Sequence, residues 1–126
     1  MWGKSVFVAP VRKSRYSREL LEAHGEFTVF VPSGDMKKTI AVCGSKSGRD
    51  TDKIALCNLT LEPSSAVRVP HIKAPGLVLE CRVIYKTDYV EAALDDKVRE
   101  MWYSGGNAGD LHTLYFGEIL AQYEQA

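Results

Sequence analysis

The sequence predicts a mainly β fold of the α+β class, built on antiparallel strands with a few short helices. Two segments, residues 77–85 and 111–123, alternate apolar and polar side chains in the manner of strands. Glycines and prolines stand between the shorter apolar segments, where they are typical of helix and strand ends. With 126 residues, 45% of them hydrophobic, the chain can bury one core, so residues 1–126 are interpreted as a single domain.

The first three expected elements are a strand, a helix and a strand. Residues 6–11 are apolar and rich in β-branched side chains, which favours a buried strand. Ser17 is a candidate N-cap for a short helix, and Gly25 is the residue expected just past its end. Residues 27–31 then form a second expected strand, which a Pro-Ser-Gly sequence stops.

The middle of the chain is expected to hold two more short helices. One begins at about Asp35 and ends at Gly44, and Asp50 can cap the other. Residues 44–49 between them are small and polar, which favours a loop held between the helices. Residues 59–72 place apolar side chains between prolines, which indicates short, interrupted strands.

The last third of the chain contains the clearest strand. Residues 77–85 put Leu77, Leu79, Cys81 and Val83 on one face and the intervening residues on the other. Residues 89–102 are expected to be helical and residues 104–110 to form a flexible loop, and residues 111–123 alternate again as a final strand.

The charges balance overall but gather in one place. Sixteen Lys and Arg balance sixteen Asp and Glu, so no global field draws the chain to nucleic acid or to an anionic membrane, and we expect neither as a partner. One basic stretch contains no acidic residue, and its cations are Arg12, Lys13, Arg15 and Arg18. An anionic ligand is therefore expected there first.

The cysteines and the N-terminus point to a cytoplasmic protein. Cys43, Cys57 and Cys81 lack the spacing of a metal motif, so we expect no metal site, and their odd number favours a reducing compartment. We expect them to behave as small buried hydrophobes. Pro10 and Arg12 interrupt the first apolar run before it could serve as a signal peptide, and no run approaches the roughly 20 apolar residues of a membrane span.

Two segments have the composition of an anion-binding loop. Arg12-Lys13-Ser14-Arg15-Tyr16-Ser17 joins a strand to a helix start and combines cations, hydroxyls and backbone N–H groups, which together hold phosphate. Gly44-Ser45-Lys46-Ser47-Gly48-Arg49 combines small residues, hydroxyls and two cations, which suits close approach to a planar or anionic ligand. Local sequence alone favours the structural alternative, a solvated basic turn and an ordinary connection between helices.

No catalytic set of side chains emerges from the sequence. His24, His71 and His112 lie far apart, and no carboxylate pattern near them suggests a catalytic triad. We therefore expect no catalytic side chain. A protein that lacks its own nucleophile or acid–base pair can take its chemistry from a bound cofactor.

Six motifs occur in an order that is typical of one family. They are Ser5–Ala9 with Arg12, Ser14–Ser17, Glu26–Val29, Cys43–Lys53, Leu79–Val83 and Asp110–Ile119. Together they extend over nearly the whole chain. The sequence resembles the flavin reductase-like, FMN-binding split-barrel family, particularly its flavoredoxin-like members.

The resemblance implies a split β-barrel homodimer with noncovalent FMN near the subunit interface. The flavin would pass electrons from NADH, NADPH or a protein donor to an acceptor. The first loop would contact the phosphate and ribityl chain, and the second would line the cofactor nearer its ring. The expected cofactor-binding residues are Arg12, Ser14, Arg15, Tyr16, Ser17, Cys43, Gly44, Ser45, Lys46, Ser47, Gly48 and Arg49.

Family members usually have further strands before the segment that matches residues 2–4. By the resemblance, we expect this barrel to lack the family's first strands. Unpaired sheet edges would then favour dimerisation. The alternative function is an N-terminally shortened, flavin-free dimer that serves as a binding or structural module.

Overall fold

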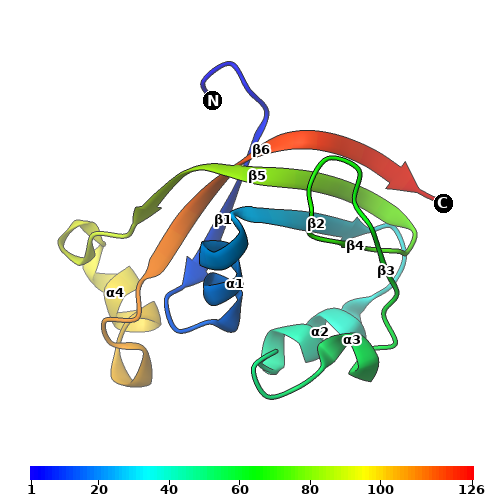
Figure 1. Cartoon of the computed structure of the whole chain (residues 1–126). Helices are drawn as coiled ribbons and strands as arrows, with labels where there is room; N and C mark the ends of the chain where they lie inside the picture. Colours follow the sequence, from blue (N-terminus) through cyan, green and yellow to red (C-terminus); the bar gives the residue numbers. More distant parts are fainter.

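A curled antiparallel sheet is the main feature of the computed structural model, which describes residues 1–126. Its strand order is β1-β6-β5-β2, and Figure 1 shows the strands arching into half a barrel. The mainly β fold predicted from the sequence is therefore confirmed. The strands are β1 (Val6–Arg12), β2 (Glu26–Pro32), β5 (Gly76–Asp88) and β6 (His112–Gln125).

Short helices and one small hairpin surround this sheet. In Figure 1, α1 lies beneath the middle of the sheet. The helices α2 and α3 lie below the end of the sheet at which β2 finishes, and α4 lies at the opposite end. The hairpin pairs β3 with β4. These elements are α1 (Tyr16–His24), α2 (Lys37–Ser45), α3 (Lys53–Leu56), β3 (Leu61–Glu62), β4 (His71–Ile72) and α4 (Asp96–Trp102), with 3-10 turns η1 (Glu91–Ala93) and η2 (Gly105–Asn107).

The two long strands curl because their pairing slips twice. Leu120 is an extra residue on β6 between the pairs of Glu80 and Cys81, and Ile84 is an extra residue on β5 after Val83. Such bulges bend a strand and increase its twist. Gly117 lies in the bend, where an added Cβ would stand 2.5 Å from the Phe27 ring, so only glycine lets the sheet approach that ring.

The two halves of β5 differ in how far they are buried. Val78, Leu79, Glu80 and Cys81 are all buried, so both faces of the strand are covered there. The segment before β4 covers the Glu80 face, and Phe27 packs against the Cys81 face. From Arg82 onward, most side chains of β5 are exposed or half-buried.

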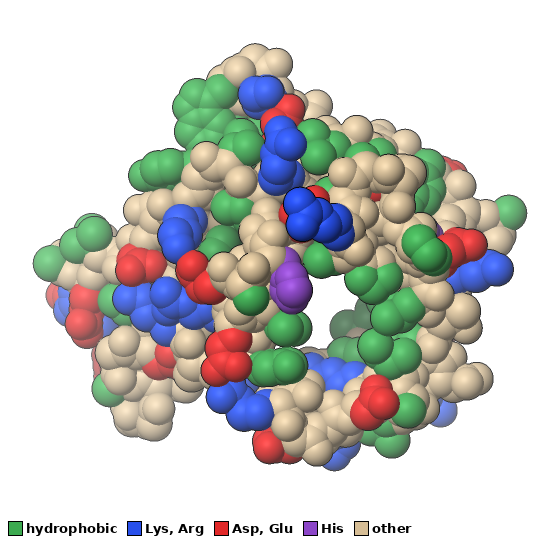
Figure 2. Space-filling model, in the orientation of Figure 1, with side chains coloured by type: hydrophobic (Ala, Val, Ile, Leu, Met, Phe, Trp, Pro, Cys, Tyr) green, Lys and Arg blue, Asp and Glu red, His purple; other side chains and the backbone are tan.

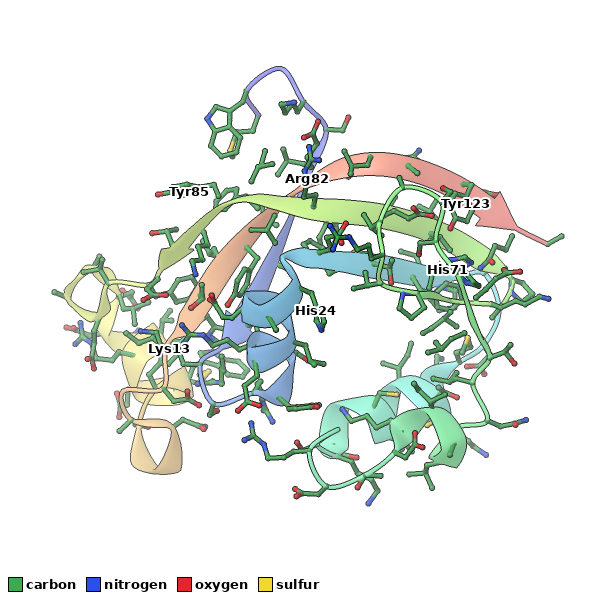
Figure 3. The ribbon with its side chains drawn as sticks, in the orientation of Figure 1. Lys13, His24, His71, Arg82, Tyr85 and Tyr123 are labelled. Carbon is green, nitrogen blue, oxygen red and sulfur yellow. The ribbon has the colours of Figure 1, made fainter.

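A cluster of polar groups that are hydrogen-bonded to one another lies where β5 and β6 meet the segment before β4. The Glu80 carboxylate is fully buried and accepts hydrogen bonds from Ala66 N (2.6 Å), Ser65 N (3.0 Å) and the Tyr123 hydroxyl (2.6 Å). His71 completes this Glu80 cluster, with Nδ1 3.1 Å from the Tyr123 hydroxyl; Figure 3 shows both side chains at one end of the sheet.

The hydrogen bonds of the Glu80 cluster decide the protonation of its carboxyl group. Burial alone would raise the pKa of Glu80, but hydrogen bonds from Tyr123, Ala66 and Ser65 together outweigh burial and lower the pKa from 4.5 to about 2. Burial and the neighbouring Glu80 carboxylate raise the pKa of Tyr123 to about 12. The carboxylate therefore stays ionised and the phenol stays protonated across the neutral range.

Most helix ends differ from the sequence prediction. The cap of α1 is Arg15 and not Ser17, although Gly25 ends this helix as expected, with φ of +66°. Gly44 lies inside α2, and Asp52 replaces Asp50 as the cap of α3, where its carboxylate accepts a hydrogen bond from Ala55 N. In each case, several residues within two positions could end the helix, and tertiary contacts select among them.

The expected helix over residues 89–102 forms only in its second half. Asp95 caps α4 by accepting hydrogen bonds from the N–H groups of Lys97 and Val98, and the residues before it make only the short η1 turn. An interior cap of this kind starts a helix regardless of the apolar pattern that precedes it. None of the helices combines the length and the apolar composition that a membrane-spanning helix needs.

The half-barrel leaves much of its surface accessible. Only 12 of 126 residues are buried, and the accessible area is 8240 Å². A compact monomer of this mass exposes about 6,700 Å². The rings of Trp2, Tyr85 and Phe116 pack edge to face, yet Trp2 and Tyr85 stay exposed. Figure 3 shows Tyr85 on the outer side of the sheet, away from α1.

Candidate functional site

A hollow lies between α1 and the segment from α2 to α3. Figure 2 shows an opening beneath the sheet there, with a histidine at its rim, and Figure 3 labels His24 at the end of α1. A cavity of about 890 Å³ lies between the first turn of α1 and the α2–α3 segment. We call it the basic cavity, and its lining residues are Ser14–Ser17, Leu20, Cys43, Gly44, Lys46–Lys53 and Ile54.

The fold brings the two candidate loops together in this one cavity. Their segments are separated by more than twenty residues in the sequence, and β2 and α2 return the second segment to the start of α1. Ten of the twelve predicted residues line the cavity; they are Ser14, Arg15, Tyr16, Ser17, Cys43, Gly44, Lys46, Ser47, Gly48 and Arg49.

Arg12 and Ser45 lie elsewhere. The Arg12 guanidinium donates hydrogen bonds to the carbonyl oxygens of Asp110 and Trp102, both at 2.9 Å, and lies over the Tyr103 ring. Arg12 therefore connects β1 to the end of α4 and to the loop before β6. The Ser45 hydroxyl donates to the carbonyl oxygen of Val42 within α2. Neither side chain lines the basic cavity.

The cations of the cavity fall into two groups. Arg15 and Lys46 are exposed and make no side-chain hydrogen bond or ion pair within the chain. Arg49 pairs with Glu19 at 3.0 Å, and Lys53 donates to the carbonyl oxygen of Cys43 at 2.7 Å. Arg15 and Lys46 are therefore the two cations that remain free to pair with an anion.

Arg49 connects the two walls of the cavity. It extends from the loop after α2 to Glu19 on α1, and its guanidinium lies 5.6 Å from the centre of the Tyr16 ring. Gly48 lies directly against the same ring, since an added Cβ there would stand 3.1 Å from Tyr16 Cδ2. Tyr16 and Arg49 thus form one packed wall of the site.

The start of α1 adds backbone donors to this site. Its N-cap, Arg15, provides no side-chain acceptor for the first-turn N–H groups of this nine-residue helix. The preceding Ser14 is held by Asp110, whose carboxylate accepts hydrogen bonds from the Ser14 hydroxyl (2.5 Å) and from Ser14 N (3.1 Å). The hydrogen bond from the Ser14 hydroxyl also lowers the pKa of Asp110, so the Asp110 carboxylate stays ionised.

The far wall of the cavity was not predicted from the sequence. Asp50, Thr51, Asp52 and Lys53 also line it, and Lys53 is fixed there by its bond to the Cys43 carbonyl oxygen. The alternating charges of this segment are visible in the sequence. However, Asp52 and not Asp50 caps α3, and the sequence did not indicate this shift of two residues.

A smaller apolar cavity of about 250 Å³ adjoins the basic cavity through a shared residue. It lies between β2 and α2 and has Phe30, Met36, Ile40 and Leu59 among its lining residues. Cys43 lines both cavities. The two cavities together offer a basic end and an apolar end.

The basic cavity is lined by the chemical groups that are typical of anion-binding sites. Its lining includes hydroxyls, four cations, the carboxylates of Asp50 and Asp52 and one thiol, and no histidine is among them. Unpaired cations beside an uncapped helix start bind anions, with phosphate as the best geometric match. Any oxidation or reduction there would need a bound redox group.

Comparisons with known proteins identify the family. Residues 5–125 match the family model described as the flavin reductase-like domain. Over 107 residues the chain is 36% identical to an uncharacterised protein of Archaeoglobus fulgidus, covering 85% of this chain and 49% of that protein.

Solved structures agree with this family. A flavoredoxin from Methanosarcina acetivorans is 27% identical with a TM-score of 0.72, covering 95% of this chain and 53% of that one. An FMN-binding protein from Thermus thermophilus has the same fold at 18% identity, with a TM-score of 0.73 over 99% of this chain and 57% of that one. The chain spans about half the length of these proteins. From the family match over nearly all its residues, we conclude that the chain belongs to the flavin reductase-like domain family.

Proposed function

We propose that the basic cavity binds the phosphate end of FMN and that the protein works as a flavin-dependent oxidoreductase or electron carrier. The observation that carries the proposal is the pair of unpartnered cations, Arg15 and Lys46, beside the uncapped start of α1. Family membership and the FMN-binding and flavoredoxin relatives support the flavin as the ligand.

The cavity suits such a ligand in charge and in size. Four cations and two carboxylates line it, so it attracts a phosphate monoester, which carries a charge near −2 at neutral pH. Its volume of about 890 Å³ lies within the range of roughly 300–1,000 Å³ that is common for cofactor sites. Gly44 has no neighbouring atom within 4 Å of an added Cβ, which leaves that side open.

In this proposal, each part of the chain has a defined task. Arg15 and Lys46 hold the phosphate by charge-assisted hydrogen bonds, and the first-turn N–H groups of α1 add neutral donors. Tyr16 and Arg49 form the wall that orients the ligand, and the adjoining apolar cavity shields its less polar part from water. The flavin itself supplies the hydride and electron transfer.

Visible absorption spectroscopy with added FMN tests this function. The expected result is one flavin per chain, retained on a desalting column and released by denaturation. Arg15→Ala should weaken FMN binding about tenfold to a hundredfold, since a charge-assisted hydrogen bond contributes about 1.5–3 kcal/mol. Arg68→Ala is the matched control, because Arg68 is exposed and lies outside the cavity.

Two outcomes would contradict the proposal. Unchanged FMN affinity in a folded Arg15→Ala variant would remove Arg15 from the site. A protein that stays colourless in excess FMN would instead support the alternative, a flavin-free binding or structural module. FAD and riboflavin in the same titration would show whether the phosphate alone directs binding.

We also propose a homodimer, with NADH, NADPH or a protein as electron donor. The chain exposes about 1,500 Å² more than a compact monomer of its mass would, and a standard interface covers about 800 Å² on each partner. The exposed rings of Trp2 and Tyr85 are suited to such contact.

Light scattering tests the dimer. The mass measured for the wild type should be twice the mass of one chain, and Tyr85→Glu should lower the measured mass. A measured mass of one chain for the wild type would contradict a dimer.

A further inference from the structure

Two of the three cysteines contact each other at the edge of the basic cavity. Cys43 lies in α2 and Cys57 directly follows α3, and their sulfur atoms are 4.0 Å apart. Both side chains are half-buried, whereas Cys81 is fully buried in β5. The expectation that all three cysteines are buried hydrophobes is therefore wrong for this pair.

The two sulfurs differ in their access to solvent-borne molecules. Cys43 lines the basic cavity as well as the apolar one, so a molecule entering either cavity comes against this residue. Cys57 lines neither of them. It ends α3, where the next residue, Asn58, takes a left-handed conformation with φ of +51° and turns the chain.

The groups around Cys57, among them Cys43 and Lys53, change the pKa of its thiol. Burial, and then the hydrogen bond and charge of Cys43, raise the pKa of the Cys57 thiol, and the nearby Lys53 ammonium partly opposes them. The Lys53 ammonium is held beside the pair by its 2.7 Å bond to the Cys43 carbonyl oxygen. Once Cys43 is in a mixed disulfide, it can no longer carry the charge that disfavours a Cys57 thiolate.

We propose that Cys43 and Cys57 form a redox-active dithiol, which exchanges with disulfides of small thiols or of proteins to give a reversible Cys43–Cys57 disulfide. The Cys43 thiolate attacks one sulfur of the incoming disulfide and releases the first thiolate. The Cys57 thiolate then attacks Cys43 Sγ and releases the second. The protein pair loses two electrons and two protons, and the incoming disulfide gains them as two thiols.

The local geometry permits this bond with a small movement. Sulfur atoms in a disulfide lie about 2 Å apart, so the pair must close by about 2 Å. Cys43 lies in the last turn of α2 and Cys57 directly follows α3, and a mostly exposed loop joins the two short helices. The closed ring encloses residues 44–56 and therefore fixes most of the second wall of the basic cavity.

Formation of the Cys43–Cys57 disulfide does not depend on flavin binding, so it is tested on the full chain without added cofactor. The protein is reduced, freed of reductant and incubated under native conditions with glutathione disulfide, then quenched by alkylation in denaturant. We expect the chain to lose the mass of two hydrogen atoms, leaving one alkylated cysteine. Trypsin should yield residues 39–46 linked to residues 54–68, and added reduced glutathione should restore all three thiols.

Single substitutions separate the two steps. Cys57→Ser should accumulate a stable glutathionyl adduct on Cys43, because the second attack is removed, and Cys43→Ser should react more slowly. Cys81→Ser is the control and should still form the bond; the wild-type peptide map locates the bond even if that variant fails to fold. Stable adducts on wild-type protein without an internal bond, or a bond that forms only after unfolding, would overturn the proposal.

Discussion

The basic cavity and the Glu80 cluster both concentrate polar side chains, but they use them in opposite ways. In the Glu80 cluster, a fully buried carboxylate receives hydrogen bonds from three neighbouring residues of the same chain. In the cavity, Arg15 and Lys46 are exposed and have no partner in the chain. The difference shows that completed hydrogen bonding marks a structural role, whereas missing partners leave charge available for a ligand.

Removing the Glu80 carboxylate should have the largest effect on stability. Glu80→Ala would leave the donors of Ser65, Ala66 and Tyr123 without their acceptor and would open a cavity, so the free energy of unfolding should fall by about 3–4 kcal/mol. Urea denaturation measures the change. The control is Glu124→Ala, which removes an exposed carboxylate and should change stability by less than about 0.5 kcal/mol. An equally small effect at Glu80 would erase the contrast between the two regions.

Acid should unfold the wild type through the same group. The folded-state pKa of Glu80 is about 2, below its ordinary 4.5, so the folded state gains stability above pH 4.5 and loses it as the pH falls towards 2. The full loss through this carboxyl is about 3 kcal/mol. The free energy of unfolding, measured by denaturation at several pH values, should fall less steeply below pH 4.5 in Glu80→Gln than in the wild type. An equal dependence on pH in the two proteins would contradict the assignment.

Arg12 was predicted to bind the cofactor, but its side chain is hydrogen-bonded within the chain like those of the Glu80 cluster. Because its guanidinium bonds two carbonyl oxygens within the chain, Arg12→Ala should lower the free energy of unfolding by about 2 kcal/mol. It should leave FMN affinity unchanged in the folded protein. Lys13→Ala is the matched control, since the exposed pair of Lys13 with Asp88 contributes little. A loss of FMN binding with unchanged stability would return Arg12 to the cofactor site.

Lys46 should show the opposite pattern, with the smallest effect on stability. Lys46→Ala is expected to weaken FMN binding about tenfold, or about 1.4 kcal/mol, and to change unfolding by less than about 0.5 kcal/mol. Raised salt should reduce the difference between variant and wild type, because an exposed charge is screened. Lys97→Ala, an exposed lysine on α4, should change neither quantity. A loss of stability with intact binding would make Lys46 structural.

The sequence predicted the strands better than the ends of the helices. Alternation identified β5 and β6, because side chains on opposite faces meet different surroundings. The bulges at Leu120 and Ile84 were not predictable, since they depend on how the two strands pair. Helix ends at Gly44 and Asp50 were misplaced because nearby residues could also end or cap those helices.

The candidate site was predictable in composition but not in its partners. Both loops could be identified by their cations and small residues, and the fold brings them into one cavity. Arg12 was grouped with them because sequence cannot reveal that carbonyl oxygens of residues 102 and 110 lie beside it. The contact between Cys43 and Cys57, fourteen positions apart, likewise arises only when α2 and α3 pack together.

The prolines of the sheet have a consequence for how the protein behaves at high concentration. β1 and β2 are the outer strands, and such strands can recruit further strands into fibrous aggregates. Pro10 removes one backbone donor from the middle of β1, and Pro32 ends β2. Pro10→Val would complete the donors of β1. It should make concentrated solutions more prone to amyloid-like precipitation, so this proline acts as a safeguard of colloidal stability.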